Sequence, residues 1–164
     1  MRGFTILGVV AIAIGLRGRL PAAAKVTVDN GPHAGSYTLE ADSPCQITEQ
    51  KPPKPRHMLY SLFGTPESDP KRFHDPKALT LLALSVPDAD ARGANHVFFA
   101  SIVFGEEDGG THYVIETRPT KPNKGSGSVT LTQQGDNATA VFDVKTADGI
   151  GYHGTLVCTG VVRY

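Results

Sequence analysis

The residues that could do chemistry are scattered along this chain, and its histidines are the clearest case. They stand at six positions, which are His33, His57, His74, His96, His112 and His153. No two of them are two to four residues apart, the spacing at which one helix or strand presents a pair of metal ligands. The histidines therefore predict no local metal site, and only a site assembled in three dimensions would bind a metal ion. We assign no metal ligand.

The sequence contains no catalytic signature. It lacks the Gly-x-Ser-x-Gly elbow, the His-Glu-x-x-His zinc motif and the phosphate-binding loop. Ser126 falls in a segment that we expect to be a flexible loop, residues 119–127, which is a poor setting for a nucleophile. Residues 149–154 match Gly-x-Gly-x-x-Gly, but we expect a strand after them where a dinucleotide site needs a helix. We assign no catalytic residue and no cofactor.

One adjacent His–Asp pair is a candidate for a site that forms only in the folded protein. His74 and Asp75 lie in the longest polar segment, residues 64–77, which holds three prolines. Loops of this length are often functional, and histidine is the commonest general acid–base group. If the chain is a hydrolase, this loop is the first place to look for its catalytic groups.

The chain has two cysteines, Cys45 and Cys158. An isolated pair in an oxidising compartment most often forms a disulfide. Closing a loop of this size would restrict the unfolded chain by about 4–5 kcal/mol in the entropic model. Two free, buried thiols are the alternative. A metal site is disfavoured, because no other Cys or His stands at ligand spacing beside either residue.

The N-terminus indicates export. Arg2 precedes an apolar run, residues 4–16, and small residues follow it. Ala22 and Ala24 fit a signal peptidase site, so we expect a signal peptide over residues 1–24 and a mature chain from Lys25. The run is shorter than the roughly 20 residues that cross a bilayer, so an uncleaved anchor is the weaker alternative. The expected location is secreted or periplasmic, with no transmembrane anchor after cleavage.

The charge balance of the expected mature chain limits its partners. Three arginines leave with residues 1–24, so 13 basic residues face 16 acidic ones and the net charge is −3. A mildly acidic domain without a basic stripe is a poor candidate for binding nucleic acid, because that binding depends on neutralising phosphates. The same balance argues against an anionic membrane surface. An unknown protein or envelope component is the expected partner.

Residues 25–164 are predicted to form a single β-rich domain. Gly and Pro are abundant, with 18 and 12 residues, and both interrupt helices and mark turns. Short segments alternate apolar and polar residues, which is typical of antiparallel strands with one buried face. Eight or nine such segments predict an all-β antiparallel sandwich of the immunoglobulin-like kind, with a small β-barrel as the alternative.

The clearest strands are residues 96–104 and a C-terminal meander at residues 128–133, 138–145 and 150–164. Residues 78–86 are continuously apolar, which fits a buried strand or a helix; the short length and the following Pro87 favour a strand. A short helix is an alternative for residues 87–92, and a helical turn for part of residues 64–77.

Two stretches resemble small exported bacterial β-domain proteins without an established activity. The opening is Gly-Pro-His-Ala-Gly-Ser-Tyr at residues 31–37. The closing hairpin is Thr-Ala-Asp-Gly at residues 146–149 followed by Gly-Thr-Leu-Val-Cys at residues 154–158. The resemblance covers the two ends of the mature chain. It implies export and a β fold, and it transfers no catalytic residue.

Three functions follow from these features as hypotheses. The leading one is an exported, non-enzymatic binding or envelope-associated module, because the chain combines a β scaffold and long polar loops with missing catalytic motifs. The second is a carrier of a small apolar ligand, which requires a closed barrel with a cavity. The third is a secreted hydrolase that uses the loop around His74 and Asp75. The sequence does not indicate an oligomeric state.

Overall fold

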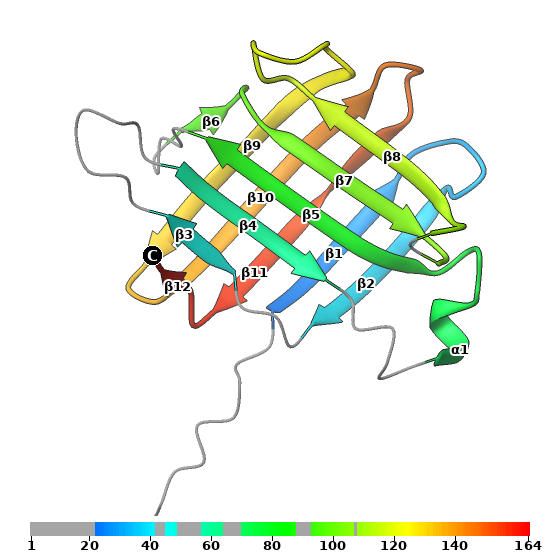
Figure 1. Ribbon diagram of the computed structural model, residues 1–164, viewed down its shortest axis with the longest axis horizontal. Coiled ribbons are helices and arrows are strands. Elements are labelled where there is room, and N and C mark those ends of the chain that lie inside the picture. The colour runs from blue at the N-terminus through cyan, green and yellow to red at the C-terminus, as the bar shows by residue number, and fades with distance from the viewer. Residues whose placement is uncertain (1–21, 42–44, 49–56, 64–69, 88–92, 107) are drawn as a thin grey trace, which may run out of the picture.

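The computed structural model describes residues 22–41, 45–48, 57–63, 70–87, 93–106 and 108–164. These residues form twelve strands and one short helix, α1 (Pro70–Phe73). The strands make two six-stranded sheets that lie face to face (Figure 1) and do not close into a barrel. The predicted all-β antiparallel sandwich is therefore confirmed, and the barrel alternative is wrong.

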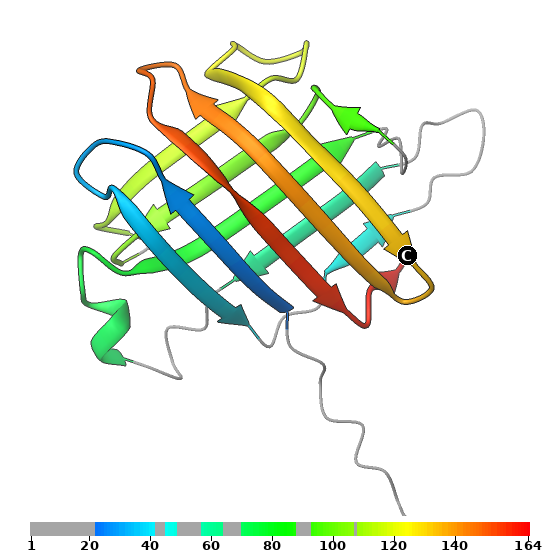
Figure 2. The same cartoon turned by 180° about the vertical axis from the view of Figure 1, so that it is seen from behind.

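The first layer, sheet A, places the first strand of the domain beside its last long strand. The order is β2-β1-β11-β10-β9-β6, and all pairings are antiparallel. In that order the strands are Gly35–Ala41, Ala22–Val28, Gly151–Thr159, Asn137–Thr146, Gly125–Gln134 and Ala94–Asn95. Figure 2 shows β1 between β2 and β11, so both of its edges are hydrogen-bonded.

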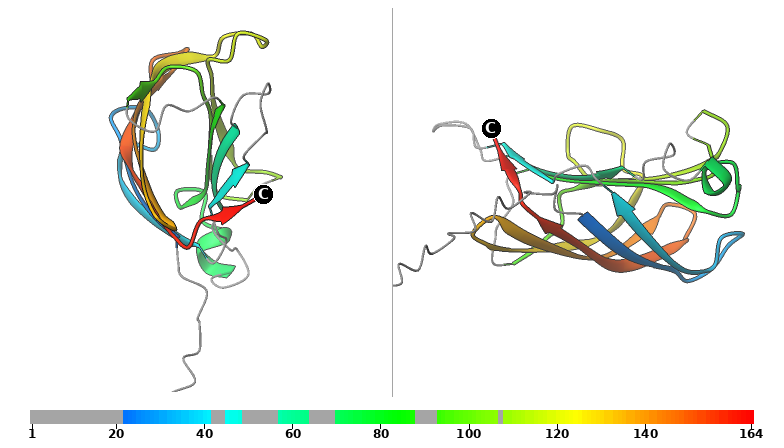
Figure 3. Two further views of the ribbon diagram at one scale, coloured as in Figure 1. Left: turned by 90° about the vertical axis from the view of Figure 1, so that its left-hand side faces the viewer. Right: turned by 90° about the horizontal axis from the view of Figure 1, so that it is seen from below.

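The second layer, sheet B, has the order β12-β3-β4-β5-β7-β8. In that order the strands are Val162–Arg163, Gln46–Thr48, His57–Phe63, Leu79–Pro87, Phe99–Phe104 and Thr111–Glu116. The β12–β3 pair is parallel and the other pairs are antiparallel. Figure 3 shows the two layers edge-on, with sheet A curving around the core and sheet B flatter.

The strand predictions agree with the structure where the period-two pattern is long. The C-terminal meander is confirmed as β9, β10 and β11, and the ambiguous run at residues 78–86 is a strand, β5. The strand count exceeds the expected eight or nine because β3, β6 and β12 have only two or three residues each, too few to show a period. The alternative helix at residues 87–92 falls mostly outside the described residues. A helical turn, α1, does lie in the long polar segment.

Two strands begin earlier in the chain than expected. β9 starts at Gly125, so Ser126 lies in a strand and the prediction of a flexible loop there is wrong. β1 starts at Ala22, three residues before the expected Lys25, and its burial alternates from its first residue. Ala22 and Ala24 are 1% and 2% exposed, so the small residues that fit a peptidase site also fit the tight space between the sheets.

Side chains from both sheets fill the space between them. The largest buried ones include Phe98, Phe104 and Ile115 on the side of sheet B and Leu131, Phe142 and Tyr152 on the side of sheet A. The predicted disulfide between Cys45 and Cys158 is confirmed, with a Cα–Cα distance of 5.8 Å. It joins β11 of sheet A to the residue before β3 of sheet B, and so it fastens the two layers together.

Within the described ranges, no helix combines the length and the apolar character that a membrane-spanning helix needs.

Candidate functional site

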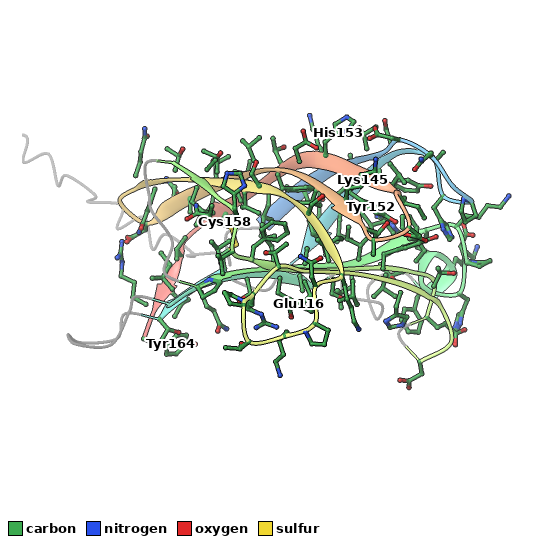
Figure 4. The ribbon with its side chains drawn as sticks, turned by 90° about the horizontal axis from the view of Figure 1, so that it is seen from above. Glu116, Lys145, Tyr152, His153, Cys158 and Tyr164 are labelled. Atoms are coloured by element: carbon green, nitrogen blue, oxygen red, sulfur yellow. A yellow bond between two sulfur atoms is a disulfide. The ribbon has the colours of Figure 1, made fainter. Side chains whose placement is uncertain are left out.

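A polar pocket opens at the end of the sandwich where the start of β9 meets the β10–β11 turn. It has a volume of about 520 Å³ and is lined by Asn123, Gly125, Ser126, Lys145, Thr146, Ala147, Asp148 and Gly149. The pocket is a shallow depression that is largely open to solvent. Figure 4 shows Lys145 at the same end of the molecule as Tyr152, with Cys158 and Tyr164 toward the other end.

One wall of the pocket is held by close approach between β9 and β10. Gly125 pairs with Thr146, and Ser126 stands opposite Lys145. A Cβ atom on Gly125 would lie 2.2 Å from the Lys145 carbonyl oxygen, so only glycine permits this pairing. The Asn123 carboxamide oxygen accepts a hydrogen bond from the Gly125 backbone N–H at 2.9 Å. The first residues of β9 are thus fixed relative to Lys145.

The other wall is the tight turn between β10 and β11. Thr146 is 8% exposed, and its backbone N–H donates to the Ile150 carbonyl at 3.0 Å. The Ile150 N–H donates to the Thr146 hydroxyl oxygen at 2.9 Å, and that hydroxyl donates to the Asp148 carboxylate. Gly149 adopts φ +95°, a conformation that glycine takes without strain. These contacts orient the Asp148 carboxylate at the pocket.

Opposite charges line the pocket. Lys145 and Asp148 are both exposed, and within the described part of the chain the Lys145 ammonium has no hydrogen-bond or ion-pair partner. The Ser126 hydroxyl likewise has no partner among the described residues. A serine–lysine catalytic pair requires a hydrogen bond between the two groups, and this pair lacks one here. The pocket therefore presents two side-chain donors without partners among the described residues and a carboxylate.

An aromatic cluster closes the core at this end. The His33 ring stacks on Phe104 with centroids 4.1 Å apart, and Tyr37 and Tyr113 meet Phe104 edge-on. His33 Nε2 lies 3.2 Å from the Pro76 carbonyl oxygen, which only accepts. The Nδ1 atom, 3.0 Å from the Tyr113 hydroxyl, is then the acceptor of that bond. The Tyr37 hydroxyl donates to the His33 carbonyl at 2.8 Å.

Tyr152 lies under this cluster with an unpaired hydroxyl. Its ring centroid is 5.5 Å from that of Tyr113. The side chain is fully buried, and its hydroxyl has no hydrogen-bond partner among the described residues. Burial raises the pKa of Tyr152 far above its usual range, and Tyr113 and Asp148 raise it further. Burial and then Asp148 also raise the pKa of Tyr113. Both phenols therefore stay neutral, close to the Asp148 wall of the pocket.

The predicted loop site at His74 and Asp75 does not line this pocket. His74 Nδ1 lies 2.5 Å from the Glu106 carboxylate, on a surface where the two side chains are 64% and 49% exposed. The Asp75 carboxylate accepts from the Lys77 N–H at 2.9 Å and so shapes the turn after α1. This geometry gives the hydrolase hypothesis no additional support.

No motif in the sequence marks the pocket residues Asn123, Lys145 and Asp148 as a site. Each looks like an ordinary loop or strand-end residue, and only the strand register brings the three together. The Gly-x-Gly-x-x-Gly stretch begins in the turn at Gly149 and runs into strand β11, which starts at Gly151, so a strand stands where a dinucleotide site needs a helix, although it begins within the stretch and not after it. Among the described residues, no group of three or more His, Cys, Asp or Glu side chains is arranged to hold a metal ion.

Comparisons with known proteins gave no match for this chain. No family model matches it, and neither a curated protein nor a solved structure does.

Proposed function

We propose that this protein is an exported, non-enzymatic binding module that holds a small zwitterionic ligand in the polar pocket. The observation that carries the proposal is the unpartnered Lys145 ammonium in a pocket that also contains the Asp148 carboxylate. A ligand carboxylate would pair with Lys145, and a ligand amine would pair with Asp148. Charge-assisted hydrogen bonds of this kind are the stronger ones in proteins.

The walls of the pocket support binding because they are fixed before a ligand arrives. One wall is the paired start of β9, and the other is the turn ordered by Thr146. A site that is already ordered loses less conformational entropy when it binds. Free amino acids and the ends of short peptides carry both charges. The envelope component expected from the sequence would present such an end.

Export remains part of the proposal. It is supported by the N-terminal sequence and by the Cys45–Cys158 disulfide, since structural disulfides persist in oxidising compartments. The apolar-carrier hypothesis needed a closed barrel, and the two sheets are open. The hydrolase hypothesis stays a weaker candidate. If a hydrolase activity were found and persisted in His74→Ala, the role of the His74 loop would be ruled out.

Binding can be tested by titrating the labelled protein in NMR with glycine, alanyl-alanine, succinate and glucose. We expect the two zwitterions to shift the amide signals of residues 123–126 and 145–149, with weaker shifts from succinate and none from glucose. Lys145→Gln should weaken zwitterion binding by about tenfold, which is about 1.4 kcal/mol. The physical reason is the loss of the only unpaired cation in the pocket lining.

Lys121→Gln is the matched control, because Lys121 is also exposed and does not line the pocket. It should leave binding unchanged. Equal effects of the two substitutions would indicate general charge attraction, and the absence of pocket shifts with both zwitterions would contradict the proposed function.

A further inference from the structure

The turn that joins β1 to β2 contains an asparagine followed by a glycine, Asn30 and Gly31. The main-chain nitrogen that follows an asparagine can attack the side-chain amide carbon and expel ammonia. A Cβ atom on the attacking residue hinders this reaction, and glycine has none. The chain has four asparagines, and bulkier residues follow the other three, which are Asn95, Asn123 and Asn137. The sequence therefore places its least hindered nitrogen after Asn30.

The Asn30 side chain is exposed and weakly held. Its Nδ2 atom donates a hydrogen bond to the Gly149 carbonyl oxygen at 3.3 Å, which is longer than the usual range for such bonds. Among the described residues, the Asn30 carboxamide has no other hydrogen-bond partner. The side chain therefore needs to break only one long hydrogen bond before its amide carbon can turn toward the Gly31 nitrogen.

The Gly31 nitrogen is available to make this attack. The turn is closed by a hydrogen bond from the Ala34 N–H to the Gly31 carbonyl oxygen at 3.2 Å. This bond uses the carbonyl group of Gly31 and leaves its nitrogen out. Within the part of the chain that the structure describes, the Gly31 N–H donates to no backbone acceptor.

Two Asp–Gly pairs in other turns provide a contrast. The Gly109 N–H donates to the Glu106 carbonyl oxygen at 3.4 Å, and the Gly149 N–H donates to the Thr146 carbonyl oxygen at 3.1 Å. In both pairs the nitrogen that would close a ring is already hydrogen-bonded. The Gly31 nitrogen lacks this protection.

The fold requires glycine at position 31 for a separate reason. Gly31 adopts φ +85°, a conformation that other residues rarely take. A Cβ atom at this position would lie 3.2 Å from the Ile150 side chain. The geometry of the turn thus selects the residue that leaves the preceding amide least protected.

We propose that Asn30 is a site of spontaneous deamidation, and that the reaction loosens the turn between β1 and β2. The Gly31 nitrogen forms a bond to Asn30 Cγ, and the Cγ–Nδ2 bond breaks. The departing nitrogen leaves as ammonia, with the proton that the Gly31 nitrogen gives up. Water then opens the resulting succinimide ring. Attack of water at Cγ gives aspartate, and attack at the main-chain carbonyl carbon gives isoaspartate, in which the main chain passes through Cβ.

Either product removes a link between two neighbouring turns. Asn30 joins the β1–β2 turn to Gly149 in the β10–β11 turn (Figure 2). A carboxylate only accepts hydrogen bonds, so it would face the Gly149 carbonyl oxygen with no donor between them. It would also add a negative charge beside Asp29, whose carboxylate lies 3.1 Å from His153 Nδ1.

Isoaspartate disturbs the turn more than aspartate does, because the main chain is fixed on both sides of position 30. Before it, the Asp29 N–H donates to the Gly151 carbonyl oxygen at 3.0 Å. After it, the buried His33 ring stacks on Phe104. An additional main-chain carbon between these anchors either strains the turn or displaces one anchor.

The test is ageing of the folded protein near neutral pH, followed by digestion in acid and mass spectrometry of the peptides. We expect the peptide with Asn30 to become heavier by the difference between an OH and an NH2 group, and to separate into aspartyl and isoaspartyl forms. Asn123 and Asn137 are also exposed and serve as references in the same sample. Their peptides should change at least about tenfold more slowly.

Asn30→Gln is the matched variant. It keeps a carboxamide at the same position but must close a larger ring, so position 30 should stay unmodified. No gain of mass at Asn30, or equal rates at Asn30, Asn123 and Asn137, would overturn the proposed site. These readouts do not depend on what the polar pocket binds.

Urea denaturation tests the effect on the turn. The purified isoaspartyl protein should unfold at a lower urea concentration than fresh protein. Asn30→Asp, which adds the charge without lengthening the main chain, should unfold between the two. An isoaspartyl protein with the same midpoint as fresh protein would overturn the proposal that deamidation loosens the turn.

Discussion

At the residue scale, the tyrosines at the pocket end of the core differ in their hydroxyl partners. The Tyr113 hydroxyl is hydrogen-bonded to the His33 ring, whereas the fully buried Tyr152 hydroxyl has no hydrogen-bond partner among the described residues. A buried polar group without a partner loses its hydration without compensation. The same Tyr→Phe substitution at the two positions should therefore affect the free energy of unfolding differently.

We expect Tyr152→Phe to leave the free energy of unfolding unchanged or to raise it by up to about 1 kcal/mol. Tyr113→Phe should lower it by about 1 kcal/mol, because it removes the partner of a buried histidine. Urea denaturation of both variants measures the difference. A loss of more than about 1 kcal/mol for Tyr152→Phe would mean that its hydroxyl has a bound partner, such as an ordered water.

A second residue-scale prediction concerns the pH dependence of the Glu116–Arg118 pair. The hydrogen bond from Arg118 holds the pKa of Glu116 below its ordinary value of 4.5. A lowered folded-state pKa means that the stabilisation is complete above the unfolded value. The stabilisation is lost as pH falls through the folded value.

Arg118→Gln should therefore destabilise the protein by about 2 kcal/mol near neutral pH, since it leaves a buried carboxylate without its cation. The difference from the unsubstituted protein should shrink as pH falls below 4.5 and through the lowered folded-state pKa of Glu116, since Glu116 is then protonated in both proteins. Guanidinium denaturation of both proteins across a pH series measures this difference in the free energy of unfolding. A difference that does not change with pH would mean that Arg118 acts by packing on Phe99 alone.

At the element scale, the start of β1 decides where the folded domain begins. Ala23 and Ala24 pair with Val157 and Leu156 of β11, and Ala22 pairs with Ala41 of β2. A cut before Lys25, as expected from the peptidase pattern, would remove these three residues from the middle of sheet A. Burial alternates from Ala22 to Val28 in the structure, but three consecutive alanines show no alternation in the sequence. The strand start was therefore missed, because alanine fits both a strand interior and a cleavage site.

We expect a chain that begins at Lys25 to be less stable than one that begins at Ala22, by about 2–4 kcal/mol. The loss combines several ladder hydrogen bonds with two buried methyl groups. Thermal denaturation of the two chains gives the comparison, and the mass of the exported protein gives the natural start. Equal stabilities would show that these residues contribute little to sheet A.

The length of each strand and the character of its two faces determine whether it could be predicted from the sequence. In β10 every second residue is buried over the whole length of the strand, and the sequence alternates accordingly, so its period is visible without a structure. β5 lacks that alternation because both of its faces are apolar. β3, β6 and β12 are two or three residues long. Only their pairing with neighbouring strands identifies them as strands.

At the scale of the whole molecule, a disulfide cross-links the two layers. Cys45 and Cys158 are separated by 113 residues; Cys158 lies in β11 of sheet A, and Cys45 directly precedes β3 of sheet B. The double substitution Cys45→Ala, Cys158→Ala should lower the free energy of unfolding by about 4 kcal/mol, because the unfolded chain gains the freedom that the loop removed.

Chemical denaturation with and without a thiol reductant provides a second measurement. We expect reduction to destabilise the unsubstituted protein by a similar amount and to leave the double variant unaffected. Little change in either experiment would mean that packing between the sheets, and not the disulfide, fixes the layers.

The sequence by itself determined the all-β class, the C-terminal meander and the cysteine pair, because these depend on local alternation and on simple counting. It did not determine the polar pocket or the aromatic cluster. His33, Tyr113 and Tyr152 come from three distant segments, and Ser126 faces Lys145 only because β9 and β10 adopt one register. Such sites are created when strands pair and layers stack, and no local pattern records which side chains will then meet.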